Sequence, residues 1–442
     1  MFGYRKLHVV ILARLWNLFS GLLFVVVSSN VFTAIEQGIV YTFLGLAAAQ
    51  FFFDLGVGVV LANIVGRFTP NHKNNTLFDD QEIAHVRSVI NYGLKWSLFA
   101  GILLFAMLAI IGFFLFSDNQ YDIDNLQTIW VFYAVLVAFS MSFHMFLRLF
   151  EGLGFVVEAA ISRSIQSFMN IALIFGLSIF EVGLGSLPIA LFVALLIASL
   201  YFVLSNAAIR DGFSRGLIAS QPINWKKDIW PFQSKMAIIW IASYIIYQSQ
   251  TPILFSLAGA EAAGFFGIAN QLFLALNTSA NIFLTYNIKD WTRLSVNGDM
   301  QALNKSFVRT LALTVGIAIV GCIAIIGGIY VIRHLGWQMA GRFPDFSLLI
   351  LFAIAACFNQ IFFCLGYYFR AQGREPLWWV SVIAAIAILI VPVVLWQSFD
   401  ISAAIWSFLF VSVIILSVLS SVYSLFLVRK NKQSTPPQKE AN

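Results

Sequence analysis

Long apolar runs are the feature that most limits what this chain can fold into. A run of about 20 apolar residues is long enough to cross the hydrocarbon core of a bilayer as a helix. Runs bounded by charged or turn residues divide the chain into six segments in each half. In the first half they are His8–Ser29, Ile39–Val65, Leu94–Phe116, Gln127–Leu147, Val156–Phe180 and Leu187–Ile209. In the second half they are Met236–Leu257, Phe265–Asn287, Val308–Ile332, Phe346–Phe369, Leu377–Trp396 and Ile401–Val428. The sequence predicts an all-α polytopic membrane protein with twelve transmembrane helices.

The composition supports this prediction and excludes several classes. The chain has 442 residues, of which 60% are hydrophobic and 10% are charged, against about 25% charged in soluble domains. The formal net charge of +6 comes from Lys and Arg between apolar runs, a pattern of topology signals that argues against nucleic acid as a partner. The three cysteines form no C-x-x-C pair, so we expect no disulfide frame, metal site or cofactor. Motifs of enzymes are not found either, and we expect no catalytic residues.

The distribution of basic residues predicts the sidedness of the chain. Lys and Arg are concentrated in alternate connections, whereas the opposite connections carry mostly Asp and Glu, with Arg333 and Arg342 as exceptions. Because basic connections stay in the cytoplasm, both termini are predicted to be cytoplasmic. We expect an N-terminal six-helix bundle over 1–209, a cytoplasmic linker over 210–234, a C-terminal bundle over 235–430 and a disordered cytoplasmic tail over 431–442.

An internal repeat relates the two halves. Gly38 follows an acidic residue at the start of the second run, and Gly264 does so at the start of the eighth. A second pair of similar segments, 150–154 and 370–374, follows the fourth and tenth runs. Because six is an even number, both halves enter the membrane from the same side, and the repeat is parallel. The sequence therefore predicts two six-helix bundles around a central cavity.

Polar residues in the first two runs are candidates for a site. Arg14 and Asn17 lie at i, i+3 in the first run, where the arginine either faces a cavity that binds an anionic substrate or extends to the inner interface. Gln50 and Asp54 lie at i, i+4 in the second run. Asp54 is either a structural partner of an arginine such as Arg14 or a carboxylate that couples transport to a proton or cation.

The fourth and fifth runs add further charged groups. Arg148 follows His144 by one helical turn, and Glu158 and Arg163 lie in the next run. His144 alone is more often a packing residue than a proton relay, and Arg148 either binds substrate or marks the cytoplasmic end of its helix. Arg163 lies deeper and is the better candidate for a substrate contact. Glu158 is a second candidate for ion coupling.

The second half offers amides in place of charges. The candidates are Gln248, Asn270, Asn277 and Asn281. Such amides either join helices or bind sugar hydroxyls. A cavity with arginines on one wall and amides on the other suits a diphosphate that carries sugars, because Arg pairs bidentately with phosphate oxygens.

Several short segments resemble one transporter family. They are Ser28-Ser29-Asn30, Glu36-Gln37-Gly38-Ile39-Val40-Tyr41, Phe53-Asp54-Leu55-Gly56 with Asn63, and Phe369-Arg370-Ala371-Gln372-Gly373. The chain resembles the O-antigen and polysaccharide flippases of the multidrug/oligosaccharidyl-lipid/polysaccharide (MOP) exporter superfamily. The resemblance implies a MATE-like protein of the bacterial inner membrane. It would move undecaprenyl-diphosphate-linked oligosaccharide to the periplasmic leaflet by alternating access, driven by a proton or sodium gradient. The expected partners are this substrate, the ion, membrane lipid, and polymerase and chain-length proteins of the same pathway.

Other functions stay open at this point. A multidrug exporter or a lipid II exporter belongs to the same superfamily, although lipid II flippases usually have two further C-terminal spans. A membrane O-antigen polymerase or glycosyltransferase would need a catalytic base or a sizeable external loop, and the predicted external connections are short. A structural partner in a biosynthetic complex would leave the deep charged residues unexplained.

Overall fold

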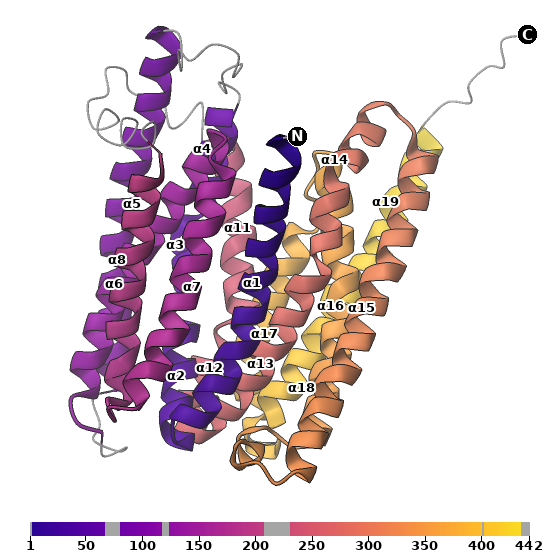
Figure 1. Ribbon diagram of the computed structural model, residues 1–442. Coiled ribbons are helices and arrows are strands. Elements are labelled where there is room, and N and C mark those ends of the chain that lie inside the picture. Colours follow the sequence, from indigo (N-terminus) through magenta and orange to yellow (C-terminus); the bar gives the residue numbers. More distant parts are fainter. Residues whose placement is uncertain (1, 67–79, 117–122, 207–229, 400–401, 435–442) are drawn as a thin grey trace, which may run out of the picture. The chain divides into compact units, whose positions relative to one another are not determined.

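The computed structural model describes residues 2–66, 80–116, 123–206, 230–399 and 402–434 (Figure 1). These residues form helices and turns, without a strand among them. They group into two compact units, Met1–Gly267 and Ile268–Asn442. The division falls inside one helix and differs from the predicted boundaries at 209 and 235, so the six-plus-six division stays a prediction. The predicted linker lies largely outside the described residues.

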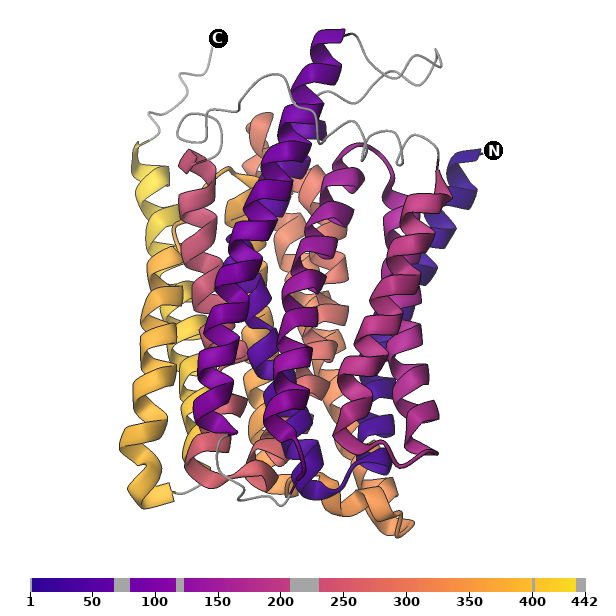
Figure 2. The ribbon, with the colours of Figure 1, turned by 90° about the vertical axis from the view of Figure 1, so that its left-hand side faces the viewer.

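The first unit contains ten helices and the beginning of an eleventh within its described residues. They are α1 (Phe2–Val31), α2 (Ala34–Ala47), α3 (Ala49–Asp54), α4 (Val57–Gly66), α5 (Asp80–Leu115), α6 (Leu126–Gly152), α7 (Val156–Ser178), α8 (Ser186–Ser205), α11 (Trp230–Tyr247), α12 (Gln250–Ala258) and the start of α13 (Ala260–Ala280). A short 3-10 turn, Gly183–Gly185, precedes α8. The long helix α5 extends beyond α6 and α7 at one end of the unit (Figure 2).

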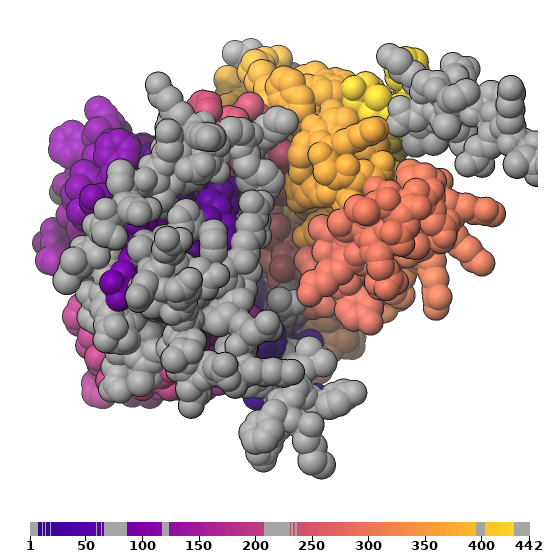
Figure 3. All heavy atoms as spheres, turned by 90° about the horizontal axis from the view of Figure 1, so that it is seen from above, coloured from indigo at the N-terminus to yellow at the C-terminus, as the bar shows by residue number. Residues whose placement is uncertain are grey.

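The second unit continues from α13. Its helices are α14 (Ile282–Val296), α15 (Met300–His334), α16 (Phe346–Ala371), α17 (Trp378–Phe399), α18 (Ser402–Phe410) and α19 (Ser420–Ser434), with a 3-10 segment, Gln338–Arg342, and a π-helical segment, Val411–Leu419. The turn from α14 to α15 lies at the end of the unit that Figure 3 views, where Asp299 caps α15 by accepting a hydrogen bond from the Ala302 N–H. Helix α19 includes 431–434, the first part of the predicted tail, and 435–442 lie outside the described residues.

The helices account for all twelve predicted spans. Within the described residues, eight helical segments are long and apolar enough to cross a membrane. The other four predicted spans are broken or short: α2 to α4, α11 with α12, α13 with α14, and α17. In the second predicted span, Leu55 and Gly56 adopt left-handed backbone angles, with φ of 47° and 72°. Because a left-handed residue ends an α-helix, α3 ends at Asp54 and α4 begins after the break. The span therefore consists of three helices, α2, α3 and α4.

A buried apolar cluster fixes the end of α6 that carries the charged residues. Leu147, Leu149 and Phe150 are each at most 1% exposed and pack with residues of α4, α5 and α8. Since neighbouring residues on a helix face different directions, this packing turns Arg148 and Glu151 away from the cluster. The same apolar contacts therefore set the direction of both charged side chains.

The end of α6 also has a well-defined cap. The Gly154 N–H donates to the Glu151 carbonyl and the Phe155 N–H donates to the Phe150 carbonyl, both at 3.0 Å. Gly154 has a φ of 97°. This pair of hydrogen bonds around a left-handed glycine is the Schellman motif.

The same motif ends α16 in the second unit. The N–H groups of Gly373 and Arg374 donate to the carbonyls of Arg370 and Phe369, at 2.9 and 3.0 Å. Gly373 therefore corresponds to Gly154. The order of the two segments in the sequence predicted Arg374 opposite Gly154, so that alignment was wrong by one residue. The positive φ of the two glycines, and not the sequence order, sets the correspondence.

The glycines that open the repeated runs meet in one close contact within the first unit. A Cβ atom on Gly38 would lie 1.7 Å from the carbonyl oxygen of Ala260, and one on Gly264 would lie 3.2 Å from the Cα of Gly38. Backbones can approach this closely only where side chains are absent. The two positions therefore hold α2 against the beginning of α13.

Candidate functional site

The break in the second predicted span places an acid at the beginning of a helix. Asp54 ends α3, and its side chain is 6% exposed. Its Oδ1 accepts a hydrogen bond from the Gly58 N–H at 3.3 Å, in the first turn of α4. Unpaired N–H groups and the helix dipole stabilise a negative charge at this position. The buried carboxylate is thus partly compensated by backbone that the left-handed turn exposes.

Arg148 of α6 supplies the rest of the compensation. Its Nη1 donates to Oδ2 of Asp54 at 2.6 Å, and its guanidinium lies 5.8 Å from the ring centre of Trp240. One of the two sequence interpretations gave Asp54 an arginine partner and suggested Arg14. Arg148 takes this place among the described side chains, and the side chain of Arg14 lies outside the described residues. Arg148 is thus part of an ion pair and not only the end of a helix.

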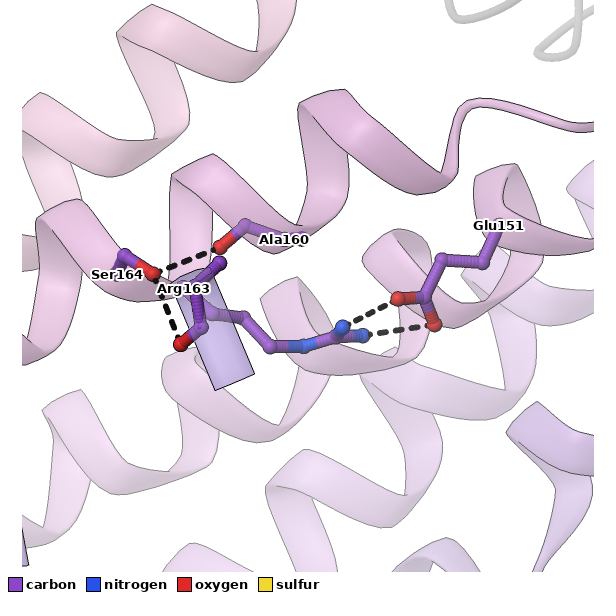
Figure 4. Close-up of polar contacts among 5 residues, drawn as sticks. Glu151, Ala160, Arg163 and Ser164 are labelled. Atoms are coloured by element: carbon purple, nitrogen blue, oxygen red, sulfur yellow. Dashed lines mark hydrogen bonds and ion pairs between the residues drawn. The ribbon is translucent and has the colours of Figure 1, made fainter. Parts of the chain in front are cut away.

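Arg163 of α7 forms a second ion pair in the same unit. Its guanidinium donates two hydrogen bonds to the carboxylate of Glu151, from Nη1 to Oε1 and, at 3.0 Å, from Nη2 to Oε2 (Figure 4). Both side chains are little more than one quarter exposed. The two charges face each other in the planar, bidentate arrangement that arginine also uses with phosphate.

A polar contact line holds α7 against α1 beside this pair. The Ser164 hydroxyl shares its one hydrogen between the carbonyl oxygens of Ala160 and Ala13, at O···O distances of 3.1 and 3.4 Å (Figure 4). One turn further along, the Trp16 indole N–H donates to the Ser167 hydroxyl at 2.9 Å. Small side chains at these positions let the helices approach closely. These contacts set the position of Arg163 along the α1–α7 interface.

Arg148, Glu151 and Arg163 line one cavity of about 430 Å³ in the first unit. Its lining comes from α1, α3, α6 and α7, and consists of Val10, Ala13, Asn17, Phe51, His144, Arg148, Glu151, Val156, Ala160 and Arg163. We call it the polar pocket. Two arginines reach it, and each is already paired with a carboxylate. The positive charges are therefore already balanced by carboxylates. An anion can bind one of these arginines if it replaces the carboxylate as the arginine's partner.

The structure brings together several of the predicted site residues. Asn17, Arg148 and Arg163 line the polar pocket, and Asn17 accepts a hydrogen bond from Ser167 at 3.2 Å. His144 also lines it, and its Nε2 is hydrogen-bonded to Oε1 of Gln166 at 2.8 Å. Glu158 lies half-buried in the first turn of α7 and is not part of the pocket lining.

Glu151 is the functional candidate that the sequence prediction missed. Glu151 was interpreted only as a member of the repeated segment 150–154. Two signals could have identified it: it lies three residues after Arg148, and it is an acid at the end of an apolar run that carries arginine. Trp240 was missed as well, because an aromatic residue in an apolar run has no distinguishing local signal.

The predicted amides of the second half are not among the residues that line the polar pocket. Gln248 follows the last residue of α11, and Asn270 is buried in α13. Asn277 accepts a hydrogen bond from Nε2 of Gln360 at 2.8 Å, which joins α13 to α16 inside the second unit. Asn281 separates α13 from α14, and its buried Oδ1 has no hydrogen-bond partner among the described residues. Asn277 thus acts as a helix-joining residue, and the role of the others in sugar binding stays a prediction.

Comparisons with known proteins identify the fold. No protein-family model matches the chain, and no characterised protein matches it by sequence. Among solved structures, an inward-facing multidrug resistance MATE family transporter of the MOP superfamily aligns with a TM-score of 0.71 and 12% identity, over 98% of this chain and 99% of that one. Lipid II flippase MurJ in its inward closed conformation aligns with a TM-score of 0.60 and 14% identity, over 94% and 87%. The MATE multidrug transporter DinF-BH gives 0.56 and 14%, over 96% and 94%.

The predicted fold class is therefore confirmed: the chain is a multi-pass, all-α membrane protein with the MATE-like fold of these transporters. At identities of 12% and 14% the similarity establishes the fold. Functions of transport and lipid flipping are known for the neighbours. For this chain, a proposal of function therefore rests on the residues of the polar pocket.

Proposed function

We propose that the chain is a flippase that moves undecaprenyl-diphosphate-linked oligosaccharide from the cytoplasmic to the periplasmic leaflet of a bacterial inner membrane, by ion-coupled alternating access. The observation that carries the proposal is that Arg148 and Arg163 reach one pocket, each held by a carboxylate. A diphosphate presents two neighbouring anionic groups, and arginine pairs with phosphate as it does with carboxylate. The two arginines of the polar pocket match the two phosphates once each has exchanged its carboxylate partner.

Substrate binding in this proposal is an exchange of partners. The diphosphate takes the place of Glu151 on Arg163, and the released carboxylate, whose side chain is already 27% exposed, turns toward solvent. This exchange costs less than desolvating a free arginine, because the guanidinium is never left unpaired. Release on the other side restores the internal pair. The Glu151 carboxylate thereby acts as an internal competitor that keeps binding reversible.

Ion coupling is proposed to act through Asp54. A proton on its carboxylate removes the negative charge and frees Arg148 to contact the second phosphate. Loss of the proton restores the Asp54–Arg148 pair and weakens the phosphate contact. Sodium at the same carboxylate would have a similar effect. Glu158 remains a second coupling candidate, and both chain termini are proposed to be cytoplasmic.

The test is export by defined variants. Cells that lack the protein should accumulate lipid-linked repeat units on the inner leaflet, and the double variant Arg148→Ala/Arg163→Ala should insert in the membrane but not restore export. Arg293→Ala is a suitable control, because Arg293 forms an exposed pair with Asp290 outside the pocket. Full export by the double variant would refute the proposal. Accumulation of single units on the outer leaflet would instead support a polymerase.

A multidrug exporter is the second candidate. Phe51 lines the polar pocket and stacks on Trp240, with ring centres 6.1 Å apart, beside the carboxylate of Asp54. Aromatic faces and a carboxylate suit an organic cation, and two of the structural neighbours are named multidrug transporters. Transport of cationic dyes by reconstituted protein, without movement of lipid diphosphates, would favour this function.

A further inference from the structure

A second cavity lies along the same pair of helices as the polar pocket. It has a volume of about 390 Å³ and runs between α1 and α7. Its lining includes Leu12, Ala13, Trp16, Ile161, Ser164 and Phe168. We call it the α1–α7 groove. Leu12 is 65% exposed and Phe168 is 50% exposed, so the groove opens at the surface of the first unit.

The two polar side chains that line the groove, Trp16 and Ser164, already form hydrogen bonds within the protein. The Ser164 hydroxyl is used in its hydrogen bonds to the carbonyls of Ala160 and Ala13. The indole N–H of Trp16 is used in its hydrogen bond to Ser167. With these groups satisfied inside the protein, the groove surface is in effect apolar. It is suited to a hydrocarbon chain and not to a sugar or a phosphate.

The groove and the polar pocket meet at one level of α1. Ala13 lines both cavities, while Val9 lines the groove and its neighbour Val10 lines the pocket. The two cavities therefore adjoin along the α1–α7 contact and share Ala13 as a lining residue. A ligand with an anionic head and an apolar tail can place its head beside Arg163 and its tail in the groove.

We infer that the α1–α7 groove binds the polyprenyl chain of the lipid diphosphate whose head group occupies the polar pocket. The inference rests on the proposed function and extends it to a chain-binding site. The pair of arginines in the pocket favours this occupant over an ordinary phospholipid. After exchange of their carboxylate partners, two arginines match the two phosphates of a diphosphate, whereas a phospholipid carries a single phosphate. Inside a bilayer the groove gains no hydrophobic transfer energy. Its contribution is close packing, which orients the chain.

Filling the groove tests the inference directly. Ile161→Trp enlarges a lining residue, and Ile189→Trp on α8 is the matched control, since Ile189 is 45% exposed and lies outside both cavities. The measurement is the affinity of the protein in lipid nanodiscs for fluorescent undecaprenyl diphosphate and for geranyl diphosphate. Loss of about ten close atomic contacts corresponds to a roughly tenfold weaker affinity. We expect Ile161→Trp to weaken binding of the long chain by that factor and to leave binding of the short chain unchanged.

The outcomes separate the inference from the proposed function. Equal affinity of Ile161→Trp and the control for the long chain overturns the groove assignment while the head-group site stands. Failure of the wild-type protein to bind either diphosphate overturns the proposed function itself. An equal effect on both chain lengths also overturns the groove assignment, because it places the damage at the head-group site.

Photocrosslinking keeps the inference testable if Ile161→Trp does not fold. A benzophenone side chain is placed at Leu12 or Phe168 in the groove, and at Phe192 on α8 as the control, which is 54% exposed. We expect crosslinks to polyprenyl-linked sugar from the two groove positions and not from the control. Crosslinks to phospholipid alone, in protein that still binds undecaprenyl diphosphate, would assign the groove to bulk lipid and refute the inference.

Discussion

Removing the charge of Glu151 should strengthen substrate binding and slow transport. Glu151→Gln keeps the size of the side chain and one hydrogen-bond acceptor but leaves Arg163 without its anionic partner. In the proposed exchange, a diphosphate displaces this carboxylate from both Nη1 and Nη2 of Arg163. In the variant the diphosphate displaces only a neutral amide. Binding is therefore more favourable by the free energy that is needed to break the ion pair in the wild-type protein.

The size of the effect follows from the exposure of the pair. Fully exposed ion pairs contribute about 0.2–1 kcal/mol, and hydrogen bonds to charged groups contribute about 1.5–3 kcal/mol. The side chains of Arg163 and Glu151 are 28% and 27% exposed, which places the pair between these limits, at roughly 1.5 kcal/mol. The affinity for lipid diphosphate should therefore rise about tenfold. Because most affinity changes appear in the dissociation rate, the export rate should fall.

The assay measures binding and turnover in the same preparation. Affinity for a fluorescent lipid diphosphate is measured in nanodiscs, and its movement between leaflets is measured in vesicles with an imposed proton gradient. Glu375→Gln is the matched control, because Glu375 pairs with Arg370 at 2.7 Å with similar exposure and lies outside the polar pocket. Unchanged or weaker affinity in Glu151→Gln would refute the partner exchange on Arg163.

Four further predictions rest on the described contacts. Asp54→Asn should retain substrate binding but lose the dependence of export on the ion gradient, and normal gradient dependence would rule out the coupling role. Asp54→Leu should lower the thermal midpoint by leaving Arg148 unpaired, which typically costs about 3–5 kcal/mol for a buried pair, and adding Arg148→Met should restore much of it. Gly38→Ala should prevent close packing of α2, because its Cβ would lie 1.7 Å from a backbone oxygen of α13, whereas Gly21→Ala has open space and should fold normally, as thermal unfolding will show. Gly154→Ala should cost about 1–2 kcal/mol in unfolding measurements, because its φ is 97° and a Cβ is unfavourable there.

The fold could be predicted because its signal is local. A helix in a bilayer must satisfy its own backbone hydrogen bonds, so each span leaves a continuous apolar run in the sequence. The breaks inside spans were not predicted, although Asp54-Leu55-Gly56 contains the acid and glycine of a turn. The apolar residues on both sides hid the turn. The hydrophobicity of a segment indicates that it lies in the membrane, but it does not reveal a single residue with left-handed backbone angles.

The candidate site could be predicted only in part because its pairings are not local. Asp54 and Arg148 are 94 positions apart, and their contact depends on how α3 packs beside α6. The sequence identified both residues as unusual charges in apolar runs but had no means to choose between arginines. The pair of Arg163 and Glu151 joins the end of one helix to the next. Its acid was assigned to the repeat, and so its charge received no separate interpretation.

The repeat itself provides an argument that Glu151 serves function. The Schellman motifs at the ends of α6 and α16 place Glu151 and Arg370 at equivalent positions, with Gly154 and Gly373 as the left-handed residues. The cap forms with an acid at this position in one unit and a base in the other, and it uses only the backbone carbonyl of either residue. The cap therefore does not require a carboxylate there. A charge that the cap does not require, directed into a pocket and held on an arginine, supports the proposed exchange of ligand on that arginine.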